Sequence, residues 1–365
     1  MQTAGLRAFV GKLSMDIDIT SPNSPTKTYT EKSASESLAA SRGFVQHCRE
    51  IGANLPEFHR LVEPVLTPRF VPTCTDELLA GLGEISETGT IRIQSHLAEA
   101  KDQVEWVRAE RGIEDIDVFE KVIYRSSHLR IPVVNWPSCY FKANLLTPRT
   151  VQAHCTFLNG QELDRLSTKG TSVAHCPLSN AYFSAKPFPL REALDQDVKV
   201  GLGTDVAGGY SLDIMNSMRQ AVSVSRMREG DRNMKPEASS TETGNLSIDW
   251  KEALFLATRG GSLALGLQGM FGIGFPFDAQ ESECRVLLSF DVLRIFISVH
   301  IYDSTTGMGV GSLDYFDLEG DTDSGISQLH AELSINSEAI EKWWCIGDVR
   351  NRGTMWVQGK KVWGP

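Results

Sequence analysis

Val200-Gly201-Leu202-Gly203-Thr204-Asp205 is the stretch of sequence that decides the fold. A short apolar run that ends in a polar, proton-handling residue is typical of a buried parallel strand whose carboxyl end contributes to a site. Three earlier stretches have the same form: Gln94-Ser95-His96-Leu97-Ala98-Glu99, Val151-Gln152-Ala153-His154 and Ser172-Val173-Ala174-His175-Cys176-Pro177. The four stretches therefore predict parallel strands with functional side chains at one edge of a sheet.

Strand and helix patterns alternate along most of the chain. Apolar runs predict strands at residues 8–15, 61–70, 91–97, 150–154, 171–176 and 198–203. Capped or amphipathic segments predict helices at residues 33–51, 75–82, 101–111, 161–169, 189–195 and 213–228. This alternation is typical of an α/β fold in which helices cover a parallel sheet. A closed (β/α)₈ barrel has eight such units, whereas six are countable here.

The last third of the chain has a different pattern. Residues 230–245 are polar and predict a surface loop, and residues 250–267 predict one apolar helix. Residues 354–362 read as two short strands around Gly359, which suits a small β-domain.

Composition excludes several classes of partner. The net charge of −10 and the absence of a basic stripe argue against nucleic acid. The N-terminus has no signal-peptide pattern, and the most apolar later stretch, residues 286–301, is broken by Asp291 and Arg294, so no membrane span is predicted. Seven cysteines without CxxC pairs fit a reducing, cytoplasmic location.

Each candidate site residue has an ordinary alternative role. A His-x-x-Glu such as His96 and Glu99 is common, Asp205 could cap a helix or a turn, and His154 and His175 could be plain strand-end histidines. Their joint placement favours a site, because three of eight histidines fall with one Glu and one Asp at consecutive strand ends. Strand ends converge in space in a barrel.

These residue types suit a metal site. Imidazole and carboxylate ligands hold zinc while they leave a position for water, and the metal lowers the pKa of that water. A nearby carboxylate such as Glu99 can carry a proton from the water to a leaving group.

The motifs resemble those of the amidohydrolase superfamily and, within it, the guanine deaminase family. The resemblance covers residues 5–280 and about 309–363. It rests on Arg7-Ala8-Phe9-Val10-Gly11-Lys12, Thr67-Pro68-Arg69-Phe70, residues 94–99, residues 174–180, residues 201–210 and Phe277-Asp278-Ala279. The run Gly203-Thr204-Asp205-Val206-Ala207-Gly208-Gly209-Tyr210 is the most discriminating of these pieces.

The resemblance implies hydrolytic deamination of guanine to xanthine and ammonia by a zinc-activated water. His96 and Asp205 would be zinc ligands, and Asp205 would also help to activate the water. Glu99 would carry protons, and His154 would hydrogen-bond near the water and the substrate. Arg69 and Phe70 would contact the purine, as would His96, Glu99 and Asp205, whereas His175 would be structural. The family also implies a possible homodimer.

Two departures from the family pattern shape the expected architecture. The family's first barrel strand ends in a His-x-His pair that supplies two further zinc ligands, and no His-x-His occurs in this sequence. We therefore expect an incomplete TIM-like (β/α)₈ barrel that retains strands 3–8 at residues 1–275, with a remnant of a small β-sandwich domain at 276–365. Residues 122–141, and also about 281–301, interrupt the family pattern and are expected to be aberrant inserts from a gene-model error.

Two alternatives remain open at this point. The chain could be another aminohydrolase, acting on a different purine, a pterin or a triazine ring. It could also be a truncated, catalytically inactive product that acts only as a binding partner. Metal content and turnover of guanine separate these readings.

Overall fold

The structure is a computed structural model of the chain. It describes residues 1–20, 29–120, 122–123, 141–206, 208–234, 244–267, 269–270, 277–283, 298–300, 337–347 and 352–364. The chain forms two compact units. The larger comprises Ala8–Pro56 and Val62–Met270, and the smaller comprises Met1–Arg7, Glu57–Leu61 and Phe271–Pro365.

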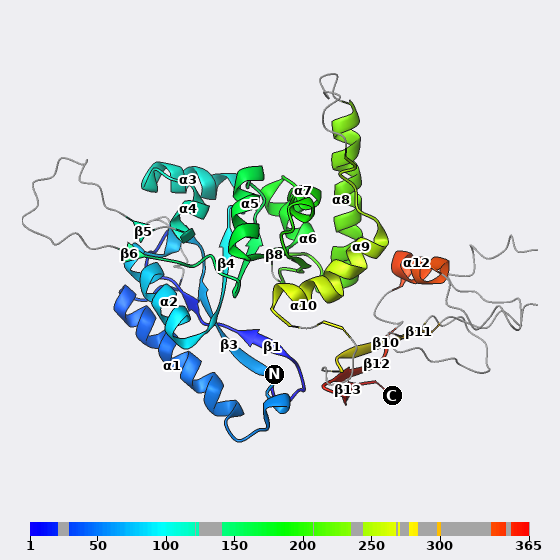
Figure 1. The fold of residues 1–365 in the computed structure, drawn as a ribbon, viewed down its shortest axis with the longest axis horizontal. Helices are drawn as coiled ribbons and strands as arrows, with labels where there is room; N and C mark the ends of the chain where they lie inside the picture. Colours follow the sequence, from blue (N-terminus) through cyan, green and yellow to red (C-terminus); the bar gives the residue numbers. More distant parts are fainter. Residues whose placement is uncertain are drawn as a thin grey trace, which may run out of the picture. The chain divides into compact units, whose positions relative to one another are not determined.

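A curled, wholly parallel sheet forms the centre of the larger unit (Figure 1). Its strands in order are β1 (Ala8–Val10), β3 (Val62–Pro68), β4 (Arg92–Leu97), β7 (Thr150–His154), β8 (Ser172–His175) and β9 (Val200–Leu202). The short strand β2 (Leu13–Ser14) continues β1, because both pair with β3. The six strand positions confirm the predicted α/β fold with an incomplete barrel.

The register of these strands brings their carboxyl ends together. Leu97 at the end of β4 pairs with His154 at the end of β7, and His175 at the end of β8 pairs with Leu202 at the end of β9. Parallel strands in register present their last residues at the same edge of a sheet. The residues that follow β4, β7 and β9 therefore share one rim.

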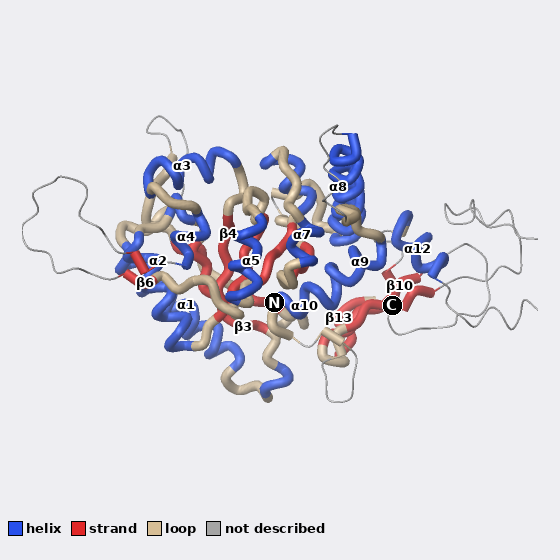
Figure 2. The backbone as a smooth tube through the Cα atoms, turned by 45° about the horizontal axis from the view of Figure 1, so that its top comes forward, coloured by secondary structure: helices blue, strands red, loops and turns tan. Residues whose placement is uncertain are grey.

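Helices cover the outer face of the sheet, as the tube drawing shows (Figure 2). The helix α1 (Ala34–Gly52) packs on β3 and on α2 (Asp76–Gly89). Both begin as predicted, because the hydroxyl of Ser33 accepts the N–H of Glu36 and that of Thr75 accepts the N–H of Leu78. The other α-helices described up to residue 234 are α3 (Lys101–Arg111), α4 (Asp115–Glu120), α5 (Gly160–Lys169), α6 (Pro177–Ser179), α7 (Leu190–Asp195) and α8 (Ile214–Met234).

The single helix predicted at residues 250–267 is interrupted. It consists of α9 (Trp250–Phe255), a π-helical turn at Leu256–Gly260 and α10 (Gly261–Ala264). The π turn and α10 lie directly against β9, and a Cβ on Gly201 would come within 2.7 Å of the Gly261 Cα. The prediction of one regular helix was wrong because this backbone contact depends on tertiary packing, which apolar periodicity does not report.

The smaller unit contains the predicted C-terminal hairpin. Strands β12 (Arg352–Val357) and β13 (Lys360–Trp363) are antiparallel, and β10 (Ala279–Glu283) pairs antiparallel with β12. Gln358 and Gly359 both have positive φ, which is the conformation of a two-residue type I′ turn. The unit also contains β11 (Ser298–His300), parallel to β10, and α12 (Ser337–Ile346).

Parts of the expected architecture fall beyond the described residues. The structure describes residues 122–123 and 141 of the first expected insert, in β5 (Val122–Ile123) and β6 (Phe141–Lys142). It describes residues 281–283 and 298–300 of the second, in β10 and β11. The division at residue 275 stays a prediction, since residues 271–276 are not described. Within the described ranges, no helix has the length and apolar character needed to cross a bilayer.

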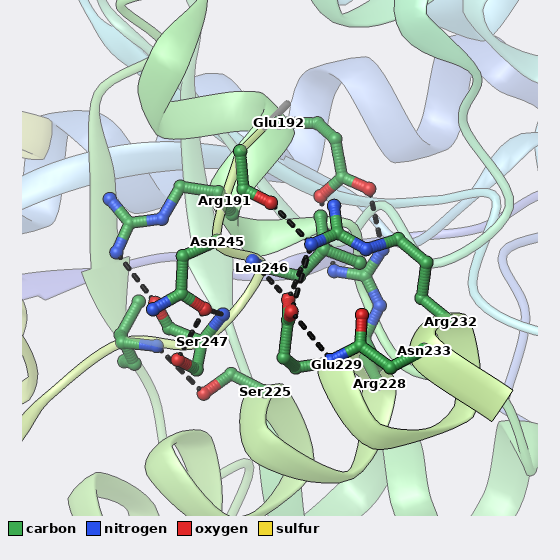
Figure 3. A network of polar contacts seen from close by, with 12 residues as sticks. Arg191, Glu192, Ser225, Arg228, Glu229, Arg232, Asn233, Asn245, Leu246 and Ser247 are labelled. Carbon is green, nitrogen blue, oxygen red and sulfur yellow. Dashed lines mark hydrogen bonds and ion pairs between the residues drawn. The ribbon is translucent and has the colours of Figure 1, made fainter. Parts of the chain in front are cut away.

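A cluster of charged side chains anchors α8, the long helix that follows the Asp205 segment (Figure 3). The guanidinium of Arg228 donates two hydrogen bonds to the Glu192 carboxylate of α7. The Glu229 carboxylate accepts the backbone N–H of Leu246 at 2.6 Å, and Ser225 accepts that of Ile248 at 3.0 Å. The cluster therefore joins α8 to α7 and to the segment that leads into α9.

Arg228→Met should destabilise the chain by about 1–2 kcal/mol, because it removes two charge-assisted hydrogen bonds from a partly exposed pair. Arg226→Met is the matched control, since Arg226 lies exposed on the same helix. The free energy of unfolding in urea measures both. Equal stability of the two variants would contradict the anchoring role.

Candidate active site

Four strand ends surround one cavity at the rim of the sheet. Its volume is about 260 Å³, and its lining residues all belong to the larger unit: Arg69, Phe70, His96, Glu99, Phe183, Asp205 and Gly208. Five of these are predicted site residues. The sixth predicted residue, His154, is buried beside them, with its ring centroid 5.3 Å from that of His96 in a stacked arrangement. The structure therefore brings together all six.

His96 is held in one tautomer by the end of β3. Its Nδ1 lies 2.6 Å from the carbonyl oxygen of Arg69, which accepts hydrogen bonds and cannot donate them. The proton must therefore reside on Nδ1, which leaves the Nε2 lone pair free. Burial lowers the pKa of His96 below its ordinary value, and the hydrogen bond to Arg69 only partly offsets this. A neutral imidazole with a free Nε2 is the form that binds a metal.

His154 is held in the same way by a different element. Its Nδ1 lies 2.9 Å from Oδ1 of the buried Asn180, so this nitrogen carries the proton that the amide oxygen accepts. Its Nε2 is buried and has no hydrogen-bond partner, and the nearest carboxylate oxygen, Oε1 of Glu99, lies 3.6 Å away. A buried nitrogen without a partner is costly unless a ligand satisfies it.

The donor atoms of His96, His154 and Asp205 form a metal-competent cluster. One atom of each residue lies within 4.8 Å of the others. Catalytic zinc sites take three nitrogen, oxygen or sulfur ligands from the protein and keep one position open. The free Nε2 of His96 and the Asp205 carboxylate fit such an ion, and the unpartnered Nε2 of His154 could serve either as a third ligand or as a hydrogen-bond partner of the bound water.

The backbone is strained where these side chains leave the sheet. Positive φ angles occur at Ala98 (46°), His154 (68°), Cys155 (54°), Asp205 (54°) and Val206 (26°). Left-handed backbone is unfavourable for residues other than glycine and is concentrated at functional sites. Hydrogen bonds hold these turns, since the Cys155 N–H donates to the Leu97 carbonyl at 2.9 Å and the Gly209 N–H donates to the Asp205 carbonyl at 3.1 Å.

The two glycines after Asp205 are required by close packing. A Cβ on Gly208 would lie 2.1 Å from Oδ2 of Asp205, and one on Gly209 would lie 1.9 Å from the Thr204 carbonyl oxygen. Any larger residue would therefore displace the Asp205 carboxylate or its turn. This packing explains why residues 208 and 209, which follow Asp205 after Val206 and Ala207, are both glycine.

Arg69 and Phe70 form another wall of the cavity. The Arg69 guanidinium carbon lies 5.0 Å from the centroid of the Phe70 ring. The Arg69 carbonyl also accepts from the backbone N–H of His96 at 3.1 Å and from the Ser95 hydroxyl at 3.1 Å. One peptide unit thus ties the Arg69-Phe70 wall to the histidine on the next strand.

Sequence reasoning missed three residues around the cavity. Asn180 orients His154, the hydroxyl of Ser184 donates to the Glu99 carbonyl at 2.6 Å, and Phe183 lines the cavity. Asn180 lies in the quoted motif after His175, so its position was visible although its role was not. Phe183 and Ser184 follow a run with no chemical pattern, and nothing local marks them.

The comparisons with known proteins agree with this geometry. The sequence model described as "Amidohydrolase family" matches residues 2–280 of the 365. The chain belongs to the amidohydrolase family. This amidohydrolase is 35% identical over 361 residues to guanine deaminase from Homo sapiens, and the alignment covers 98% of the chain. It spans 63% of the length of that human relative.

Solved structures of two enzymes illustrate the shared fold. Guanine deaminase from C. acetobutylicum, with guanine bound in its active site, superposes with a TM-score of 0.66 at 22% identity, over 99% of this chain and 67% of the other. Atrazine chlorohydrolase from Arthrobacter aurescens complexed with zinc gives a TM-score of 0.63 at 16% identity, over 99% and 62%.

His175 is not among the residues that line the cavity. Its side chain is buried, its ring centroid is 5.2 Å from that of Phe188, and its Nδ1 has no hydrogen-bond partner. Burial lowers the pKa of His175 from 6.5 to about 3. The unfolded chain therefore binds a proton at this residue between these pH values while the folded chain does not, and stability falls as pH decreases through that window.

His175→Gln should remove this part of the acid sensitivity. Between pH 6.5 and 5 the unaltered chain should lose about 1–2 kcal/mol of unfolding free energy relative to the variant. Urea unfolding across this range measures the difference. Burial raises the pKa of Asp115 to about 7, but Asp115 makes the same contribution to the pH dependence of stability in both proteins, so it cancels in the comparison. Parallel pH profiles would contradict the buried, uncharged state of His175.

Proposed function

We propose that this amidohydrolase catalyses the hydrolytic deamination of guanine to xanthine and ammonia. The observation that carries the proposal is the convergence of His96, His154 and Asp205 with the Glu99 carboxylate at a cavity walled by Arg69 and Phe70. The likeness to human guanine deaminase and to a guanine deaminase with bound guanine supports this substrate.

Zinc is the proposed cofactor, with His96 and Asp205 as its ligands. Bound at these donors, it would supply a water whose pKa is lowered towards neutrality. The structure of a related chlorohydrolase complexed with zinc supports the choice of metal. The tautomer that the Arg69 carbonyl imposes presents Nε2 of His96 for this purpose.

Glu99 is the proposed proton carrier. It lines the cavity, and its Oε1 lies 3.6 Å from Nε2 of His154. A carboxylate here can carry the two protons of the attacking water in turn, the first to a ring nitrogen and the second to the amino group that leaves as ammonia. The Ser184 hydroxyl holds the Glu99 main chain, so the carboxylate is aimed from a fixed backbone.

His154 and Arg69 are proposed to orient the reactants. The Nε2 of His154, with no partner in the described structure, can hydrogen-bond to the water or to the ring at its reacting carbon. The guanidinium of Arg69 can donate to the purine carbonyl oxygen, and the Phe70 ring can pack against the purine plane. Recognition of a carbonyl by a fixed donor favours guanine over adenine, which carries an amino group at that position.

The proposed roles predict different losses in three variants. His96→Ala and Asp205→Asn should lose zinc and turnover together. Glu99→Gln should keep zinc and lose turnover by about 10²-fold or more, because the proton carrier is removed. Zinc content by atomic absorption and xanthine formation from guanine measure these effects. Glu105→Gln is the control, since Glu105 is exposed on α3 and its carboxylate pairs with Lys101.

His154→Ala tests the division of labour within the cluster. We expect it to retain zinc and to lose turnover, as suits a residue that orients the water and the ring. Loss of zinc would instead make His154 a third ligand.

Turnover of adenine or melamine at the rate of guanine would contradict the proposed function. So would the absence of turnover of any of these three compounds by the zinc-loaded chain.

A further inference from the structure

A π-helical turn contributes Phe183 to the lining of the cavity. It spans Asn180–Ser184, directly after α6, and it ends at Ala185 with a left-handed backbone (φ 48°). Short π turns are rare in proteins and occur frequently at functional sites. This one is fastened at both of its ends to residues of the proposed chemistry.

The first anchor is Asn180, whose Oδ1 accepts the Nδ1 proton of His154 at 2.9 Å. The second is Ser184, whose hydroxyl donates to the Glu99 carbonyl at 2.6 Å. The two anchors are four residues apart and reach different strands, β7 and the segment after β4. The turn therefore has a fixed position relative to both His154 and Glu99.

Two aromatic residues lie between the anchors, and they differ in placement. Phe183 lines the cavity, together with Phe70, whereas Tyr182 is not among the lining residues. Both are largely exposed, at 55% and 71%, and their rings meet edge to face with centroids 4.8 Å apart. A large apolar side chain exposed at a cavity gains by burial against a flat ligand.

We propose that Phe183 is a substrate-contacting residue that packs on the face of a planar heteroaromatic ring and forms, with Phe70, the aromatic lining of the ring-binding cavity. The π turn sets its position, because the Asn180 and Ser184 anchors fix Phe183 relative to His154 and Glu99. The ligand class is a fused or single nitrogen-containing ring, of which every member has a π face. This inference rests on the proposed function only for the choice of such a ring as substrate.

The test compares Phe183→Ala with Tyr182→Ala in the full, zinc-loaded chain. Loss of an aromatic wall should weaken binding of guanine by about 10- to 100-fold, as stacking contributions to base binding suggest. The KM for guanine should rise in parallel while kcat changes less than about threefold, because the anchors remain. Tyr182→Ala should leave both constants within about twofold. Circular dichroism and the thermal midpoint establish that both variants fold.

Phe183→Tyr and Phe183→Leu sharpen the result. The tyrosine keeps a flat ring and should bind guanine within about threefold of the unaltered chain, whereas leucine keeps apolar volume without a flat face and should fall between phenylalanine and alanine. Equal binding by Phe183→Ala and Tyr182→Ala would overturn the proposal, as would a loss confined to kcat.

Calorimetric titrations of the unaltered chain and of Phe183→Ala with guanine, adenine and melamine separate this inference from the proposed function. If guanine is not turned over but one of these rings binds and Phe183→Ala weakens that binding, the aromatic wall stands and the deaminase assignment fails. If guanine is turned over and Phe183→Ala binds it normally, the assignment stands and the wall fails. If none of the rings binds to the unaltered chain, both fail.

Discussion

The hydrogen bond from Nδ1 of His96 to the Arg69 carbonyl is the interaction on which the site depends. It fixes the proton on one nitrogen and leaves the other free to face Asp205 and His154. It also joins β3 to β4 at the point where Arg69, part of the proposed purine-binding wall, and His96, a proposed zinc ligand, leave the sheet. Asn180 repeats this arrangement for His154, so both imidazoles present Nε2 to the same space.

The backbone of the site adopts conformations that are locally unfavourable. Left-handed conformations at His154 and Asp205 carry an energetic cost that the surrounding fold must meet. The parallel register, the hydrogen bonds between the strand-end turns and the close packing of Gly208 on Asp205 supply that constraint. A rigid sheet edge is suited to this task, because a loop of equal composition would relax to a lower-energy shape.

The parts of the structure that sequence predicts are those that depend on local chemistry. Ser33 and Thr75 mark the starts of two helices because their hydroxyls accept N–H groups that have no partner within the helix. His96, His154 and Asp205 could be assigned to one site because the carboxyl ends of parallel strands meet at one edge of the sheet. The π turns at Asn180 and Leu256 could not be predicted, since apolar periodicity does not distinguish a π turn from an α-helix. The left-handed backbone of His154 and Asp205 runs against local preference, so only tertiary structure reveals it.

Measuring the tautomers of His96 and His154 is the most direct test of the claim that hydrogen bonds fix the proton on Nδ1 of both rings. Long-range ¹H–¹⁵N spectra of the chain with ¹⁵N-labelled histidine, assigned with His96→Asn and His154→Asn variants, report which ring nitrogen carries the proton. At neutral pH and without zinc, both His96 and His154 should show a protonated Nδ1, and added zinc should shift Nε2 of His96. An Nε2–H tautomer at His96, or an Nε2 signal there that zinc leaves unchanged, would contradict the central claim.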